Sequence, residues 1–247
     1  MRTIDIGRIM ARLDMHLGHN DYEAAERHLL SWLAEAQAAS DMCAELLLLN
    51  ECMGLYRKTA RRTEAEDCAS RALALADAEG ATVTAATTRI NAATVYKAFG
   101  RAAEALPLFA EAREIYERHL APTDPRLGGL YNNMALAMVD EHRFAEAAEL
   151  YALAAETMRH APDGTPELAI TYLNMADAAA LEHDYEAAEE EIGRLVEAAW
   201  ELLDAYPCRD GRYAFVCEKC ASTFGHYGYF VYEATLAERA RRIYEGT

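Results

Sequence analysis

The sequence predicts an all-α fold, a right-handed α-solenoid of about six antiparallel helix pairs. The first observation is an internal repeat: four asparagines in similar local frames lie 41, 42 and 41 residues apart, at Asn50, Asn91, Asn133 and Asn174. Self-similarity at a fixed period of this size is typical of stacked supersecondary units. The second observation is composition, because the 247 residues are 52% hydrophobic with only 13 Gly and 6 Pro, and no long strand-like alternation occurs. Such a chain favours helix throughout.

Turn-forming residues divide the chain at nearly even intervals and place the helices. Strong breaks fall at 79–80, 121–125, 161–166 and 207–211, and softer breaks fall at 18–21, 59–61, 99–101, 141–143, 182–184 and 227–228. Each stretch between strong breaks therefore reads as two helices joined by a tight turn. The expected pairs span residues 3–39, 41–79, 82–120, 125–160, 166–205 and 211–245. Because such units bury little surface alone, we expect one cooperative solenoid over residues 1–247.

Small residues recur at one fixed point in the second helix of each pair. Soon after each of the first five softer breaks an alanine occupies the same place, at Ala25, Ala65, Ala105, Ala147 and Ala188. Small side chains let one helix nest into the groove of its neighbour. An apolar stripe with helical spacing follows in two successive units, at Ala105, Phe109, Ala112 and Tyr116 and at Ala147, Tyr151, Ala154 and Met158. This stripe is expected to face the core.

These phrases resemble tetratricopeptide repeats, most clearly where residues 132–136 (Asn-Asn-Met-Ala-Leu) are followed by 142–147 (His-Arg-Phe-Ala-Glu-Ala). The period near 41 exceeds the usual ~34 and looks like the long-helix subtype of kinesin light chains, here as a bacterial-type stand-alone solenoid. The resemblance covers residues 3–245. It is weakest in the first and last pairs, where Ala11 and Lys219 take the place of the asparagine.

The resemblance implies a scaffold or adaptor that binds a protein or peptide in a concave groove lined by the first helix of each pair. The groove residues expected from the matching positions are Asn50, Asn91, Asn132, Asn133, Asn174, Arg57, Arg89, Lys97 and Tyr131. An asparagine amide offers a donor and an acceptor, as a peptide group does. A clamp for a terminal carboxylate is not expected, because Thr87, Gly129 and Ile170 lie one turn before the asparagines and none is basic.

Two alternatives stay open for this surface. The repeated asparagines would serve stability instead of recognition if each bonded a carbonyl of the adjacent helix and stapled the stack. At the level of function, the alternative is a peptide-sensing regulatory protein that acts through a separate output partner.

The net charge of −17 bears on the class of partner. Such a surface repels phosphate backbones, so neither nucleic acid nor an anionic membrane is an expected partner. A basic or neutral polypeptide is easier to attract. The sequence has no apolar stretch of membrane-spanning length, no signal-peptide pattern at its N-terminus and no secreted-type cysteine framework, which predicts a cytoplasmic protein.

No motif indicates catalysis or a cofactor, and we do not expect an enzyme. A weak alternative is a zinc site built on the sequence Cys217-Glu218-Lys219-Cys220, with Cys208 upstream and His226 downstream. Because this CxxC falls in a predicted helix, buried thiols are the expected reading. Cys43, Cys52 and Cys68 are likewise expected in the core.

Three further features of the sequence are the turn histidines, a basic patch and an aromatic cluster. The histidines have a structural interpretation, and each of the other two has two possible interpretations. His142 and His183 take the place of Gly100 in the turns, which predicts a left-handed backbone there. The basic patch at 57–62 either neutralises carbonyls at a helix end or holds an acidic stretch of a partner. The aromatic cluster at 229–232 either forms a homodimer contact or closes the last pair.

Overall fold

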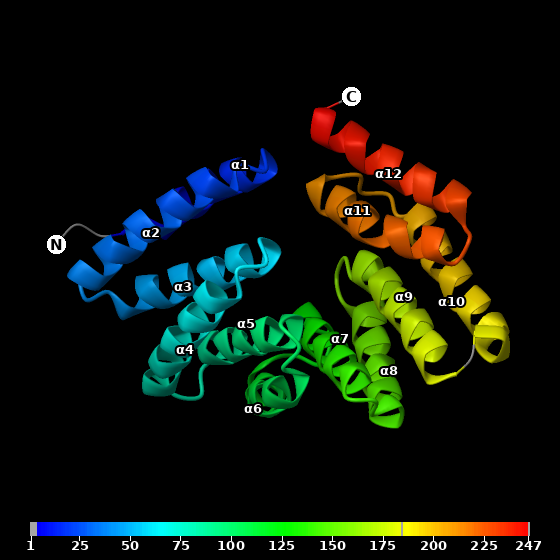
Figure 1. Ribbon diagram of the computed structural model, residues 1–247, viewed down its shortest axis with the longest axis horizontal. Coiled ribbons are helices and arrows are strands. Elements are labelled where there is room, and N and C mark those ends of the chain that lie inside the picture. The colour runs from blue at the N-terminus through cyan, green and yellow to red at the C-terminus, as the bar shows by residue number, and fades with distance from the viewer. Residues whose placement is uncertain (1–3, 184, 247) are drawn as a thin grey trace. The chain divides into compact units, whose positions relative to one another are not determined.

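The structure of the chain is a computed structural model that describes residues 4–183 and 185–246. Within these residues the regular elements are twelve α-helices and no strand, so the predicted all-α class of paired helices is confirmed (Figure 1). The helices are α1 (Ile6–Gly18), α2 (Tyr22–Ala38), α3 (Met42–Lys58), α4 (Arg62–Glu79), α5 (Val83–Ala98), α6 (Ala102–His119), α7 (Pro125–Asp140), α8 (Phe144–His160), α9 (Thr165–Glu182), α10 (Tyr185–Ala205), α11 (Gly211–His226) and α12 (Phe230–Glu245).

The chain divides into two compact units, Met1–His119 and Leu120–Thr247, and each is described by itself. In the first unit α1 to α6 form three pairs, and the first helices α3 and α5 of successive pairs lie side by side. In the second unit α7 to α12 form three more pairs, and α9 packs against both α7 and α11. A single solenoid over residues 1–247 stays a prediction.

The tight turns inside the pairs use a left-handed residue, which reverses the chain in few residues. The turn residue has φ near +54° at Asn20, +56° at Ala60 and +77° at Gly100, and His142 adopts the same conformation with φ of 56°. The expectation for His142 is confirmed. The expectation for His183 is wrong: it has φ of −123° and ψ of 160°, so α9 ends there in an extended residue.

The core follows the predicted small-residue positions. The five repeated alanines are at most 3% exposed, and the two apolar stripes are buried throughout. Helices α7 and α8 approach each other closely, because a Cβ on Gly128 would lie 2.8 Å from the Met158 Cε. Cys52 and Cys68 lie in the core as expected. Cys43 is exposed instead, because in the first turn of α3 the neighbouring Ala44 takes the core-facing position.

Candidate functional site

In the first unit, the asparagines of successive first helices are hydrogen-bonded to each other. The Asn91 Nδ2 on α5 donates to the Asn50 Oδ1 on α3 over 2.8 Å. The Asn50 amide nitrogen in turn donates to the Leu46 carbonyl oxygen at 2.8 Å and to the Thr88 Oγ1 at 3.0 Å. Asn50 therefore links α3 to α5 through two separate contacts.

The second unit holds an equivalent bond between α7 and α9. The Asn174 Nδ2 donates to the Asn132 Oδ1 over 3.0 Å. The repeat frame aligns Asn174 with Asn133, yet the side chain bonds the residue before it. Asn133 is half-buried on α7, and its side chain has no hydrogen bond within the part of the chain that the structure describes.

These bonds use only part of each amide. An asparagine carries two N–H donors and a carbonyl oxygen with two lone pairs. After the pairing, Asn91 and Asn174 each keep a carbonyl oxygen and one N–H, and Asn132 keeps its amino group. All of them are half-buried, so they reach the surface. Each unit thus has its own asparagine face, formed by Asn50 and Asn91 in the first unit and by Asn132, Asn133 and Asn174 in the second.

Arg89, expected beside Asn91 in the groove, points elsewhere. Its guanidinium is buried and bonds the Asp77 Oδ1 at 2.6 Å, the Glu111 Oε2 at 2.9 Å and the Ala85 carbonyl oxygen. These partners belong to α4, α6 and α5. The expectation that Arg89 supplies a groove cation is wrong, because residues two apart on a helix point to different sides.

Tyr131, a second expected groove residue, is only 7% exposed and lies in the core. The expectation that it lines the groove is wrong, because an aromatic residue at helical spacing packs inside. The two other cations differ in exposure, since Lys97 is half-buried on α5 and Arg57 is exposed near the end of α3. Protein atoms around its guanidinium lower the pKa of Arg57.

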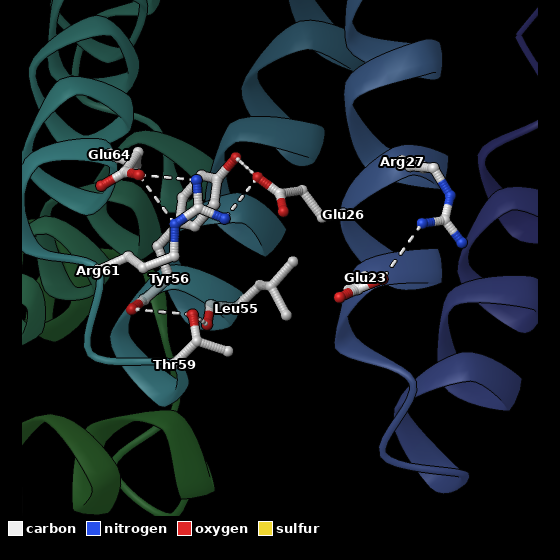
Figure 2. A network of polar contacts seen from close by, with 8 residues as sticks. All are labelled: Glu23, Glu26, Arg27, Leu55, Tyr56, Thr59, Arg61 and Glu64. Atoms are coloured by element: carbon white, nitrogen blue, oxygen red, sulfur yellow. Dashed lines mark hydrogen bonds and ion pairs between the residues drawn. The ribbon is translucent and has the colours of Figure 1, made fainter.

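The rest of the basic patch at 57–62 is mostly paired with acidic residues, which the sequence reasoning did not foresee. Figure 2 shows Arg61 between Glu64 and Glu26, with bonds of 2.8 and 2.7 Å, and its guanidinium stacked on the Tyr56 ring. The Tyr56 hydroxyl also donates to Glu26, so α2 is tied to the α3–α4 turn. Arg62 pairs with Glu66.

The pattern of contacts made by Arg61 recurs one helix pair later. Arg101 bonds Glu104 three residues on and also Glu66 on the preceding second helix, and it stacks on Tyr96. Arg143 makes the local bond to Glu146 in the second unit. The signal in the sequence is an Arg-x-x-Glu motif whose arginine is the last residue of each of these soft breaks. Arg61 and Arg101 join neighbouring pairs and are not free to bind a partner.

A distinct polar site lies near the ends of α9 and α11 in the second unit. The Tyr227 hydroxyl donates to the Asp177 Oδ1 over 2.8 Å. Burial raises the pKa of Asp177 above its ordinary value, while the Tyr227 bond and the nearby His226 oppose this shift. The Tyr151 hydroxyl on α8 is buried without a hydrogen-bond partner in the described ranges, and burial together with Asp177 and Asp140 raises its pKa.

The four zinc candidates do not assemble. Cys217 and Cys220 are buried in α11, whereas Cys208 is exposed and donates to Asp210, and His226 is exposed at the end of α11. Among residues 4–183 and 185–246 no group of three or more His, Cys, Asp or Glu residues is placed to hold a metal ion. The reading of Cys217 and Cys220 as core thiols is confirmed.

The aromatic cluster at 229–232 was expected either to form a homodimer contact or to close the last helix pair, and its members differ in burial. Tyr232 stacks on Trp200 with centroids 4.0 Å apart, and so closes the last pair. Phe230 and Val231 are 68% and 75% exposed on α12 and line a shallow hollow with Ala234.

None of the helices in the described ranges is both long and apolar enough to cross a bilayer.

Comparison with known proteins supports the repeat interpretation. A family model for the tetratricopeptide repeat matches residues 48–118, from within α3 nearly to the end of α6. No curated protein matches the chain.

Solved structures match over most of the length. BtubC (BKLC) from P. vanneervenii is 20% identical with a TM-score of 0.69, and the match covers 82% of each chain. A putative kinesin light chain of Podosopora anserina with nearly identical repeats is 17% identical with a TM-score of 0.56, covering 80% of this chain and 94% of that one. A single-substitution form of that second protein gives a TM-score of 0.57 at 17% identity, covering 80% and 93%. Residues 48–118 therefore match the tetratricopeptide repeat, and the chain has the fold of kinesin-light-chain-like repeat proteins.

Proposed function

We propose that this chain is a binding module for a protein or peptide partner and that the asparagine faces of its units make the contact. Repeat folds of this type serve in general as protein-interaction scaffolds, because stacked units present an extended surface. The observation that carries the proposal is the pairing of asparagine amides across successive first helices, at 2.8 Å in one unit and 3.0 Å in the other. The pairing holds each amide in place while part of it remains unused.

A pre-positioned amide suits a peptide backbone. A peptide group presents one N–H and one C=O, and the amides of Asn91 and Asn174 each retain one donor and one acceptor. The bonds between asparagines restrict these side chains before a partner arrives, so less rotamer entropy is lost on binding. Stapling and recognition are thus compatible on this surface, with Asn50 mainly a staple and Asn133 mainly available to a partner.

The charge supports a polypeptide partner over a nucleic acid. A net charge of −17 disfavours binding to a phosphate backbone, which needs Lys and Arg contacts. The six cysteines are free thiols, which suits a reducing compartment, and we place the protein in the cytoplasm. The proposal is a non-catalytic scaffold or adaptor, in keeping with repeat proteins of this fold.

The test is a binding measurement on an array of capped random heptapeptides, using the whole chain. We expect Asn133→Ala to weaken binding of the selected peptides about two- to tenfold, as expected for one or two lost hydrogen bonds. The matched control is Gln37→Ala, which removes an exposed amide from the second helix α2. Equal binding by both variants, or no selected peptide at all, would overturn the proposal.

A further inference from the structure

Asp177 is a half-buried carboxylate with no basic side chain bonded to it among the described residues. Several other half-buried carboxylates of the chain have arginine partners. Those with side-chain exposures of 18 to 29% are Glu45 with Arg71, Asp124 with Arg126, Glu26 with Arg61, Glu66 with Arg62 and Arg101, and Glu167 with Arg212. Within the described residues, Asp177 has only the neutral Tyr227 hydroxyl as a hydrogen-bond partner. A charge that is withdrawn from water without a bonded counter-charge is an opening for a cation from outside.

A second polar group lacks a partner near Asp177. Tyr151 is 2% exposed, and its hydroxyl has no hydrogen-bond partner among the described residues. The Asp177 and Asp140 carboxylates act electrostatically on this hydroxyl and raise its pKa. Buried hydroxyls are nearly always bonded, so an unmet one calls for an explanation. A hydroxyl oxygen can accept a bond from an ammonium or guanidinium group.

Aromatic rings flank the carboxylate. Tyr227, which bonds Asp177, is stacked on Tyr185 with centroids 6.4 Å apart and planes 16° from parallel. Tyr227 is 7% exposed, whereas Tyr185 at the start of α10 is 49% exposed. Tyrosine faces attract Lys and Arg side chains, most strongly when the cation is partly desolvated.

The other charged groups around Asp177 leave it acidic. His226 is the nearby basic side chain whose charge acts on Asp177, and it is exposed at the end of α11. Asp140, at the end of α7, adds negative charge next to Tyr151. It also lies at a helix C-terminus, whose partial negative charge favours cations.

We propose that Asp177, Tyr227, Tyr185 and Tyr151 form a seat for a lysine or arginine side chain of the partner polypeptide. The carboxylate accepts a bond from the cation, the exposed Tyr185 ring covers its stem, and Tyr151 offers a second acceptor when Asp177 turns towards the cation. This inference rests on the proposed function in that the cation belongs to a bound polypeptide. It adds that a basic residue is what the second unit selects.

The test uses a small probe that does not depend on the asparagine faces. The probe is the capped tripeptide acetyl-Gly-Lys-Gly-amide, and the matched control peptide replaces lysine by norleucine, which has no amine. Ring-labelled tyrosine allows the signals of Tyr185 and Tyr227 to be followed by NMR during titration of the whole chain. We expect the lysine peptide to shift both signals in a saturable manner and the norleucine peptide to leave them unchanged.

Asp177→Asn is the decisive variant, because the amide oxygen can still accept the Tyr227 bond. We expect it to weaken lysine-peptide binding at least about fivefold, as the loss of one charged contact predicts. The control Glu190→Gln changes the net charge equally at an exposed position of α10 and should bind as the parent does. A Tyr185→Leu variant, expected to lose part of the affinity, provides a second readout if Asp177→Asn folds poorly.

The outcomes separate this inference from the proposed function. Equal shifts with norleucine, or unchanged lysine binding in Asp177→Asn, would overturn the seat even if heptapeptides bind the asparagine faces. Asp177-dependent lysine binding without any heptapeptide binding would support the seat and remove the asparagine faces as the peptide contact.

Discussion

Replacing Asn50 by alanine tests whether the asparagine pairing stabilises the first unit. The side chain makes three hydrogen bonds, with Leu46, Thr88 and Asn91. A typical bond contributes about 0.5–1.5 kcal/mol net. The bond to Leu46 counts least because that carbonyl also accepts a helical N–H, and alanine regains roughly half a kcal/mol of helix propensity. We therefore expect a loss of about 2 kcal/mol.

The assay is urea unfolding followed by tryptophan fluorescence. Trp32 lies in the unit that holds Asn50 and Trp200 lies in the other unit, so a Trp200→Phe background makes the signal specific. A loss of about 2 kcal/mol corresponds to a fall in Tm of roughly 4–8 °C for a protein of this size.

The matched control is Asn133→Ala on α7, read by thermal unfolding of the whole chain. Because Asn133 has no bond in the described part of the protein, we expect a change within about 0.5 kcal/mol. A stability loss below about 0.5 kcal/mol for Asn50→Ala, or an equal loss for Asn133→Ala, would refute the stapling argument.

Three further variants in the second unit are measured by unfolding. Gly129→Ala should stabilise the protein by about 0.5–1 kcal/mol, because its Cβ meets open space. Gly128→Ala should leave stability unchanged or lower it, because its Cβ forces the Met158 side chain aside. The reverse order of stabilities would contradict the packing of α7 on α8. Asp177→Asn should stabilise the protein at pH 7. Folding raises the pKa of this carboxyl, so the folded protein loses stability as the pH rises above the ordinary pKa of an aspartate, and the gain from the substitution should vanish below about pH 3. A gain that persists below that pH would disprove the assignment to ionisation.

Much of the fold could be predicted because the repeat imposes the same steric demand at each unit. Ala105 and Ala147 are buried where the spacing placed them, since only a small side chain allows that helix approach. The turn at His142 was equally visible, because its place is taken by glycine one unit earlier. His183 occupies the same place but ends α9 in an extended conformation, which no local sequence feature indicates.

The polar contacts of the candidate site were harder to predict because they depend on side-chain reach across neighbouring helices. The repeat frame pairs Asn174 with Asn133, yet the bond goes to Asn132. The sequence-based stapling hypothesis named a backbone carbonyl of the adjacent helix, whereas the cross-helix contacts join side chains. Arg89 is different, because helical geometry alone separates it from Asn91 and could have excluded it.

The arginines explain where a partner can find uncompensated charge. Arg61 and Arg101 neutralise glutamates at the junctions between helix pairs, so these charges are paired within the protein. Negative charge remains on the first helices α3 and α9. At Glu51 on α3, surrounding protein atoms and the nearby Asp14 raise the carboxyl pKa, and burial does the same at Asp177 on α9. Burying these carboxylates without a cation lowers the stability of the folded protein. A basic segment of a partner that binds there would restore that stability. The acidity of the chain is thus connected to recognition of a partner.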